Sequence, residues 1–337
     1  MHTRNLLIEK IKPALNTCIS CVYSTSKQIF VGGIDGSIKF WQLPSLKSEK
    51  SLVGHKDLIN VITMIKENIL LTASDDSTLI KWDLQSCVGI TKYVGHEKAV
   101  TCCLVIENNF LSSGLNLDLD FSILSGSWDK TIRIWNPRLN KAIRVLDNHT
   151  APISSMERVT LKGVVHIVSG SINGELYFWD LKRLQLIVKI NGHKEKINHL
   201  YVANDKLMSS SHDNLIKIWN DNFESVQEIR STGGFIKKFF IFRENWLIFA
   251  SGGKTIEIWD RKKRKFLAKE TSKATIFDVI PHDDNRLIIA SGKELKILRY
   301  FKRGLYVLYV SHKYRVQNRF PPIIVKEIYN FIIGENF

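Results

Sequence analysis

Tryptophan residues recur along this chain at a nearly constant spacing, and this period limits the possible folds more than any other feature of the sequence. Six of them, spaced 41, 53, 44, 40 and 40 residues apart, are Trp41, Trp82, Trp135, Trp179, Trp219 and Trp259. A seventh copy keeps the spacing but has Leu298 in the Trp position. A repeat of about 40 residues is typical of folds built from copies of one small structural unit.

The residues around each Trp predict short β-strands. In Lys254-Thr-Ile-Glu-Ile-Trp259, as in most other copies, apolar and polar residues alternate, which is typical of a half-buried strand. The second copy predicts four strands: Val61–Lys66, Ile69–Ser74, Thr78–Asp83 and Ile90–Val94. A single four-stranded sheet cannot bury both of its faces, whereas a closed ring of seven sheets can, and closure also protects the strand edges.

Further residues recur in register with the tryptophans. Fourteen residues after a Trp position come His55, His96, His149 and His193, three of which follow a Gly, and the same offset from Leu298 gives His312. With its Gly-His pairs, Ser-x-Asp turns and Trp-Asp pairs such as Trp82-Asp83, the sequence resembles the WD-repeat β-propeller family. The resemblance implies an all-β, seven-bladed propeller over residues 19–312, between an N-terminal segment (1–18) and a short helical C-terminal tail (313–337).

The resemblance also implies structural tetrads, in which a His, a Ser, an Asp and the Trp of one blade are joined by hydrogen bonds. Three copies contain the whole set: His55, Ser74, Asp76 and Trp82; His96, Ser127, Asp129 and Trp135; His193, Ser211, Asp213 and Trp219. A His bonded to Asp and Ser is also the arrangement of a hydrolase triad. Because a catalytic site occurs once and these sets recur, we expect a structural role.

Two segments compete for the outer strand of the seventh blade. Leu6–Ile11 would close the ring from the N-terminal side, which is the usual solution in the family, and Leu305–Val310 would close it from the C-terminal side. The offset to His312 slightly favours the C-terminal segment. The first eighteen or so residues would then cap or extend the ring.

The sequence predicts neither an enzyme nor a cofactor or metal site. It contains no phosphate-binding Gly loop, no His-Glu-x-x-His motif and no Gly-x-Ser-x-Gly motif, and Cys18 and Cys21 form an isolated pair. The adjacent Cys102 and Cys103 should point to opposite faces of a strand, as reduced thiols. With no apolar run long enough for a signal peptide or a membrane span, we expect a soluble protein of the cytoplasm, the nucleus or both.

Positive charge is predicted to gather on one face of the ring. The chain has 48 Lys and Arg against 33 Asp and Glu, a formal net charge of +15, and many of these bases follow a Trp position by two to seven residues. They are Lys47, Arg138, Lys141, Lys182, Arg183, Arg261, Lys262, Lys263, Arg264, Lys265, Lys302 and Arg303. Such a face would attract acidic protein or RNA. Because Phe301-Lys302-Arg303-Gly304 resembles the Phe-Arg-Arg-Gly motif of phosphoinositide-binding propellers, lipid remains an alternative.

Two segments depart from the repeat. The third copy has an insertion, Asn108–Asp120, which is either a contact loop or an early start of its second strand. In the tail, Pro321 and Pro322 can open an amphipathic helix whose apolar residues would contact a partner or fold back onto the ring: Phe320, Ile324, Ile328 and Phe331. This stretch resembles the opening helix of an F-box or the last helix of a SOCS box, which recruit ubiquitin-ligase subunits.

The sequence therefore predicts a non-enzymatic scaffold or adaptor that presents the faces of a propeller to protein partners in a multiprotein complex. Two alternatives remain open. A substrate receptor of a ubiquitin ligase would bind an adaptor through the tail, and a component of a ribonucleoprotein assembly would bind through the basic face. The step from fold to scaffold rests on the family resemblance.

Overall fold

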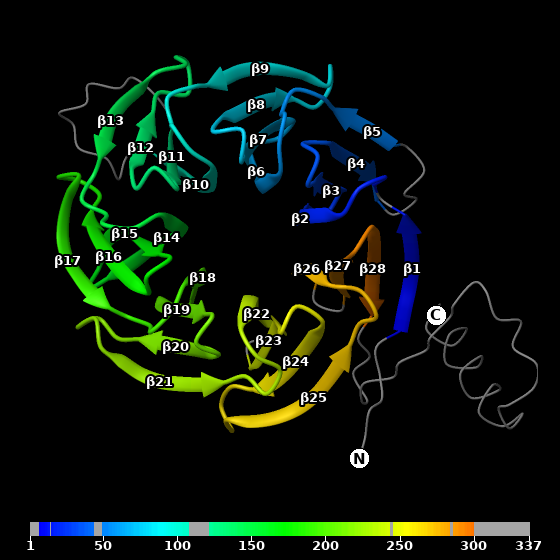
Figure 1. The fold of residues 1–337 in the computed structure, drawn as a ribbon, viewed down its shortest axis with the longest axis vertical. Coiled ribbons are helices and arrows are strands. Elements are labelled where there is room, and N and C mark those ends of the chain that lie inside the picture. Colours follow the sequence, from blue (N-terminus) through cyan, green and yellow to red (C-terminus); the bar gives the residue numbers. More distant parts are fainter. Residues whose placement is uncertain are drawn as a thin grey trace, which may run out of the picture.

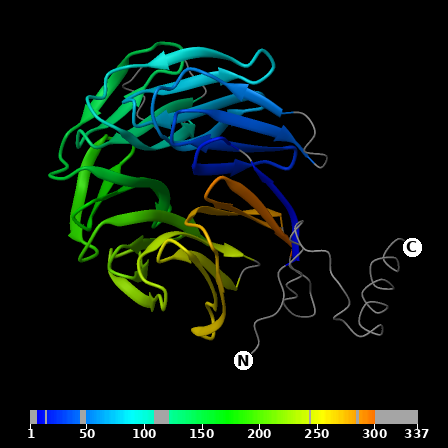
Figure 2. The same ribbon diagram turned by 45° about the vertical axis from the view of Figure 1, so that its right-hand side comes forward.

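Seven four-stranded antiparallel sheets form a ring around a central channel in the computed structural model (Figure 1). The structure describes residues 7–13, 15–43, 49–107, 121–242, 245–283 and 286–299. In each sheet the innermost strand lines the channel and the outermost lies on the circumference, as the turned view also shows (Figure 2). The seven-bladed, all-β architecture predicted from the Trp period is confirmed.

Each blade contains four strands, which follow one another from the channel outwards. Blades 1 to 3 contain β2 (Ile19–Ser24), β3 (Gln28–Gly33), β4 (Ile38–Gln42), β5 (Glu49–Leu52); β6 (Ile59–Lys66), β7 (Ile69–Ser74), β8 (Leu79–Asp83), β9 (Val88–Tyr93); β10 (Val100–Glu107), β11 (Phe121–Ser127), β12 (Ile132–Trp135), β13 (Ala142–Leu146). Blades 4 and 5 contain β14 (Ile153–Leu161), β15 (Val164–Ser171), β16 (Glu175–Asp180), β17 (Gln185–Asn191); β18 (Ile197–Ala203), β19 (Lys206–Ser211), β20 (Leu215–Trp219), β21 (Ser225–Arg230). Blades 6 and 7 contain β22 (Ile236–Phe242), β23 (Trp246–Ser251), β24 (Thr255–Asp260), β25 (Lys265–Thr271); β26 (Ile276–Asp283), β27 (Arg286–Ser291), β28 (Glu294–Arg299) and β1 (Leu7–Pro13).

The N-terminal segment closes the ring. Strand β1 pairs antiparallel with β28, from Leu7 opposite Arg299 to Pro13 opposite Glu294. The slight preference for Leu305–Val310 was therefore wrong, because β1 already occupies the outer edge of β28. Closure pairs β1, which precedes the first blade in the sequence, with β28 of the seventh blade. The two ends of the repeat array are thus joined by backbone hydrogen bonds.

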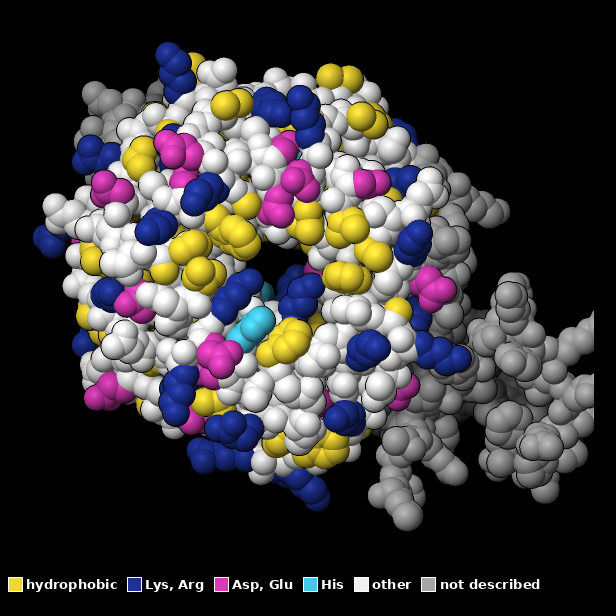
Figure 3. All heavy atoms as spheres, viewed as in Figure 1, with side chains coloured by type: hydrophobic (Ala, Val, Ile, Leu, Met, Phe, Trp, Pro, Cys, Tyr) yellow, Lys and Arg dark blue, Asp and Glu magenta, His cyan; other side chains and the backbone are white. Residues whose placement is uncertain are grey.

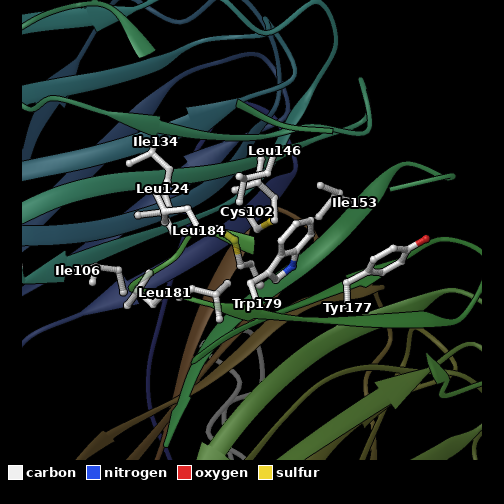
Figure 4. Packing of buried hydrophobic residues seen from close by; sticks show 13 residues of the cluster. Cys102, Ile106, Leu124, Ile134, Leu146, Ile153, Tyr177, Trp179, Leu181 and Leu184 are labelled. Carbon is white, nitrogen blue, oxygen red and sulfur yellow. The ribbon is translucent and has the colours of Figure 1, made fainter. Parts of the chain in front are cut away.

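The core lies between the blades. The side chains of Trp41, Trp82, Trp135 and Trp179 are almost completely buried, and each packs with residues of an adjacent blade. Figure 4 shows one such layer, in which residues of blade 3 meet Tyr177 and Trp179 of blade 4. Cys102 belongs to this layer, whereas Cys103 packs in the layer between blades 2 and 3, so the prediction that they face opposite sides of a strand is confirmed.

A polar ladder also connects successive blades near one mouth of the channel. In blades 1 to 5, the second residue of the innermost strand donates a side-chain hydrogen bond to the carbonyl of the first residue of the next innermost strand: Ser20 to Ile59, Asn60 to Val100, Thr101 to Ile153, Ser154 to Ile197 and Asn198 to Ile236. In blades 6 and 7 the equivalent positions hold Lys237 and Phe277. The ladder thus runs from blade 1 to blade 6 and is replaced by other contacts where the ring closes.

Two segments singled out by the sequence, the insertion 108–120 and the tail 313–337, lie outside the described residues. The predicted C-terminal helix is among them. Within the described ranges, the structure contains no helix that is long and apolar enough to cross a membrane.

Candidate functional site

Three blades contain a complete tetrad at the end where the second strand turns into the Trp strand. In each, His Nδ1 bonds to an Asp carboxylate, His Nε2 bonds to a buried hydroxyl, and that hydroxyl accepts a hydrogen bond from the indole Nε1. The His–Asp distances are 2.9 Å for His55–Asp76, 2.7 Å for His96–Asp129 and 2.8 Å for His193–Asp213. The Trp–hydroxyl distances are 2.9 Å for Trp82–Thr72, 2.8 Å for Trp135–Ser125 and 2.8 Å for Trp219–Ser209.

The hydroxyl of each tetrad is not the one predicted from the sequence. Ser74, Ser127 and Ser211 were expected, but the bonds to His and Trp come from the residue two positions earlier: Thr72, Ser125 and Ser209. Residues two apart on a strand share a face, so the pattern alone offered both candidates. The later serines instead bridge the turn: Ser74 donates to the carbonyl of Asp57 and accepts from the N–H of Asp76.

The hydroxyl groups of the three tetrads are buried. The side chains of Thr72, Ser125 and Ser209 have no exposed surface, so a substrate cannot reach the hydroxyl oxygen. Burial raises the pKa of Asp76 and Asp129, but the hydrogen bonds from His55 and His96 outweigh it and keep both carboxyls below their usual pKa. In the part of the chain that the structure describes, no three His, Cys, Asp or Glu side chains form a metal site.

Blade 6 contains a substitute for the tetrad that the sequence analysis missed. Gly233 lies fourteen residues after Trp219, where other copies have His, and Glu257 projects into the vacated space with no exposed surface. Its carboxylate accepts hydrogen bonds from Gly233 N–H (2.7 Å), Ser251 Oγ (2.8 Å), Ser231 Oγ (2.9 Å) and Trp259 Nε1 (3.1 Å). The missing His at position 233 was the signal that could have revealed it.

Blade 4 contains a partial tetrad. His149 Nε2 bonds to Ser169 Oγ at 2.7 Å, and the Trp179 indole donates to the same oxygen at 2.8 Å. Asn173 takes the Asp position and bonds to Ser171, while the Tyr177 ring packs against the imidazole with centroids 3.7 Å apart. His149 Nδ1 is buried without a partner among the described residues. Burial lowers the pKa of His149 to about 3.

We expect folding stability to fall between pH 7 and pH 5.5 because two histidines are buried in the neutral form. Burial lowers the pKa of His149 to about 3, with Glu175 and Lys189 nearby, and burial and Lys238 lower the pKa of His199 to about 3. Each histidine takes up a proton only on unfolding below its unfolded pKa of about 6.5, so stability is full above that pH and is lost as the pH falls towards about 3. Each should remove about 1 kcal/mol between pH 7 and 5.5.

Urea denaturation at several pH values measures this slope. The variant His149→Gln should be less stable at pH 7 but should lose less stability on acidification, and His149→Gln/His199→Gln should have the shallowest profile of the three proteins over the same range. A slope that both variants leave unchanged would contradict the assignment.

In five blades, the residue after the Trp shapes the turn on the opposite face of the ring. Asp180 and Asp260 accept hydrogen bonds from the backbone N–H groups of Arg183 and Lys263, both at 2.9 Å. Asp83, Asn136 and Asn220 make equivalent bonds, so an Asn serves as well as an Asp. These bonds fold the backbone of the turn inwards, which leaves the side chains at its tip to project into solvent.

The predicted basic residues lie on these turns. Lys262, Lys263, Arg264 and Lys265 are exposed, Arg261 is partly exposed, and no ion pair links the five to any residue that the structure describes. Lys182 and Arg183 occupy the equivalent turn of blade 4, two blades away, where Arg183 lies 3.9 Å from Asp180. We call the turn residues 261–265 with Lys182 and Arg183 the basic turns. The other predicted contact residues lie outside the described ranges: Lys302, Arg303, Phe320, Ile324, Ile328 and Phe331.

Acidic residues are found at the other end of the Trp strands. The turns that precede these strands contain Asp35, Asp75, Asp76, Asp129, Glu175 and Asp213. A strand has its preceding and following turns at opposite ends, so these acidic residues lie on the face opposite the basic turns. The basic turns are therefore one candidate interaction surface.

Comparisons with known proteins agree with this architecture. The family model described as "WD domain, G-beta repeat" matches residues 86–136 and 184–220. The chain is similar to Mitochondrial division protein 1 of Eremothecium gossypii, with 23% identity over 203 residues, which are 55% of this chain and 28% of that protein. It is also similar to a U3 small nucleolar RNA-associated protein 15 homolog of Xenopus tropicalis, with 25% identity over 58% of this chain and 36% of that protein.

A longer match extends over most of the ring. The Ribosome biogenesis protein WDR12 homolog of Anopheles gambiae is 23% identical over 343 residues, which cover 86% of this chain and 72% of that protein. The matches to the Eremothecium and Xenopus proteins, in contrast, span only about a third of their length.

Proposed function

We propose that this chain, a WD-repeat protein, is a non-enzymatic scaffold that binds an acidic partner through its basic turns. The observation that carries the proposal is the projection of Arg261–Lys265 from the rim of a rigid ring, with no ion pair to a described residue. Strands β24 and β25 are paired along their length up to this turn, so the charges are presented on a well-supported hairpin. The ring needs little rearrangement to present them, which limits the entropy lost on binding.

The charge of the basic turns determines the expected behaviour of the complex. Exposed cations attract the opposite charges of a partner through long-range electrostatic interactions. At physiological ionic strength, salt largely screens these interactions beyond about 8 Å. Such contacts mainly accelerate association and select partners of opposite charge. We therefore expect binding that weakens steeply as the salt concentration rises.

A ribonucleoprotein assembly is the second candidate setting. The names of two similar proteins refer to U3 small nucleolar RNA and to ribosome biogenesis, and an RNA backbone is an acidic partner that Lys and Arg can neutralise. On the basis of these names, we propose a nuclear location and an RNA-containing complex for this chain. In that setting the basic turns would contact phosphates without reading sequence.

We expect Lys262→Glu/Lys263→Glu/Arg264→Glu to reduce capture of partners at least about tenfold, because reversal replaces attraction with repulsion. The measurement is affinity purification of the full chain from native extract, with and without nuclease. The matched control Lys56→Glu/Lys98→Glu/Lys130→Glu makes the same net change with exposed lysines of the opposite face. Partners lost after nuclease would support the ribonucleoprotein setting, and partners retained by the Lys262–Arg264 variant would refute the role of the basic turns.

A further inference from the structure

The turn between β15 and β16 of blade 4 contains the pair Asn173-Gly174. An Asn before Gly loses its side-chain amide more readily than other Asn residues, because Gly has no side chain to keep its backbone nitrogen away from the Asn side-chain carbonyl. The fold requires Gly at position 174, where φ is +84° and a Cβ would clash with the carbonyl of His193. A reactive Asn-Gly pair is therefore held at a fixed position, with the Asn side chain exposed to water.

Asn173 stands where three other blades have the Asp of a complete tetrad. In those blades the carboxylates of Asp76, Asp129 and Asp213 lie 2.7–2.9 Å from the Nδ1 atom of the tetrad His. In blade 4 the His149 side chain is buried, and its Nδ1 has no hydrogen-bond partner among the described residues. A carboxylate at position 173 would be the acceptor that this buried nitrogen lacks.

A buried hydroxyl polarises the side-chain carbonyl of Asn173. The Ser171 hydroxyl donates a hydrogen bond to Asn173 Oδ1, and it lies farther, at 3.1 Å, from the carbonyl oxygen of Glu175. Negative charge develops on Oδ1 when a nucleophile attacks the side-chain carbonyl carbon, and a donor already aimed at this oxygen stabilises that charge. The side-chain amide of Asn173 also donates to the Glu175 carboxylate, which fixes the orientation of the whole amide group.

The nucleophile in this turn is the backbone nitrogen of Gly174. Its N–H donates a long hydrogen bond of 3.3 Å to the carbonyl of Ser171, whereas the Gly174 carbonyl accepts from the N–H groups of Gly192 and His193 at 3.1 and 2.9 Å. The turn is thus fixed through the carbonyl of Gly174, while the nitrogen is held loosely. A nucleophile and an electrophile held in adjacent positions of a rigid turn react as if at high concentration.

We propose that Asn173 is a deamidation site, at which the folded chain converts an Asn into the Asp of a fourth complete tetrad. The Gly174 nitrogen gives its proton to solvent and attacks Cγ of Asn173; the bond between Cγ and Nδ2 breaks, and the amide nitrogen takes up a proton and leaves as ammonia. Water then opens the cyclic imide at Cγ, and the Gly174 nitrogen recovers its proton. The net reaction consumes one water and releases one ammonia, without oxidation or reduction.

The Ser171 hydroxyl also determines which product forms. The imide has two carbonyl carbons, and attack of water at the backbone carbonyl would give isoaspartate, which lengthens the main chain. Ser171 donates to the oxygen on the other carbonyl carbon, Cγ, and therefore makes Cγ the better electrophile. Water entering at Cγ gives Asp, which keeps the length of the turn.

The charges around the turn direct the new carboxylate towards His149. Figure 3 shows Asp and Glu side chains interspersed with Lys and Arg on the face of the ring that it draws, so the nearest charges decide its position. The nearest acid, Glu175, is already bonded to Lys189, Tyr177 and Thr150. Repulsion from Glu175 and attraction to the Nδ1–H of His149 act in the same direction. This site does not depend on the function proposed above.

The tripeptide Ile-Asn-Gly occurs a second time, at 190–192, and provides a control of identical local sequence. Asn191 ends the extended strand β17, where the ladder holds its side chain away from the Gly192 nitrogen. Peptide mapping by mass spectrometry of the full chain, incubated at neutral pH in water labelled with heavy oxygen, measures both sites. We expect Asn173 to deamidate at least about tenfold faster than Asn191, and Asp to exceed isoaspartate. In urea the two rates should become equal.

Two variants separate the reaction from its consequence. Ser171→Ala should slow deamidation at Asn173 at least about tenfold and leave the rate at Asn191 unchanged. The rate at Asn191 reports any loosening of the ring in this variant, and the comparison of the folded with the urea-unfolded chain does not depend on it. Asn173→Asp supplies the product directly and should raise the pKa of His149, which burial holds at about 3, as nuclear magnetic resonance of the imidazole measures.

The proposal has two parts that can fail separately. Equal rates at Asn173 in the folded and the unfolded chain, or an excess of isoaspartate, would overturn the deamidation site. An unchanged pKa of His149 in Asn173→Asp would overturn completion of the tetrad.

Discussion

Replacing Glu257 by Leu should lower the free energy of unfolding by about 3–5 kcal/mol, because the change leaves a group of buried donors without an acceptor. The carboxylate accepts from Ser231, Ser251, Gly233 N–H and the Trp259 indole, and it has no exposed surface. Leucine has a similar volume, so the loss measures hydrogen bonding more than packing. Equilibrium denaturation in urea gives the value.

The acid dependence of this contribution has a definite sign. Burial raises the pKa of Glu257, but hydrogen bonds from Ser251, the Thr232 N–H and Ser231 outweigh it, so the pKa in the folded state is below the usual value. The stabilisation is therefore full above the unfolded pKa of about 4.3 and is lost as the pH falls through the folded value. The variant Glu257→Leu should lack this part of the acid response.

An exposed carboxylate provides the control for Glu257. Glu97→Leu changes the same residue type on the surface and should shift stability by no more than about 0.5 kcal/mol. Glu257→Gln should fall between the two, since its oxygen still accepts but its amide group faces other donors. Comparable stability of Glu257→Leu and Glu97→Leu would show that the carboxylate does not replace the tetrad of the other blades.

The number and order of the blades could be predicted from the sequence because a Trp marks a fixed position in six of the seven copies. Strand boundaries followed within about two residues: Ile69–Ser74 was predicted as observed, and Thr78–Asp83 begins at Leu79 in the structure. The seventh blade was found without its Trp because Leu298 keeps the spacing. Repetition thus compensates for the weak signal of each strand.

The details that depend on three-dimensional register could not be read from one sequence. Ser125 and Ser127 lie on the same face of β11. Only the position of the Trp135 indole decides which of the two hydroxyls accepts a hydrogen bond from its N–H. The two segments predicted for the outer edge of β28 lie at opposite ends of the chain. The local sequence pattern of each is that of a strand, so it does not show which of them pairs with β28. Glu257 was missed for a related reason: its donors come from residues up to 26 positions away.

The basic turns were predictable because they follow a Trp by a fixed number of residues, and each turn is folded by the Asp or Asn after that Trp.

Replacing Asp278 by Leu should destabilise the closed ring by about 3–5 kcal/mol, because it leaves a partly buried charge without its partner. Asp278 of blade 7 pairs with Lys238 Nζ of blade 6 at 2.9 Å and accepts a hydrogen bond from the Val22 N–H of blade 1 at 2.9 Å. This one carboxylate, only 4% exposed, connects three blades where the polar ladder is interrupted. The ring closes there, so amide hydrogen exchange in β1 and β2 should accelerate together with the loss measured by urea denaturation.

A double change separates the ion pair from the backbone bond. Lys238→Met/Asp278→Leu removes both charges and should recover most of the loss, while the unpaired Val22 N–H should still cost about 1–3 kcal/mol. The exposed pair Lys27–Glu67, 3.0 Å apart, is the control, and Glu67→Leu should cost no more than about 1 kcal/mol. If Asp278→Leu costs no more than Glu67→Leu, or if exchange in β1 stays slow, then the pairing of β1 with β28 and the apolar layers close the ring without this carboxylate.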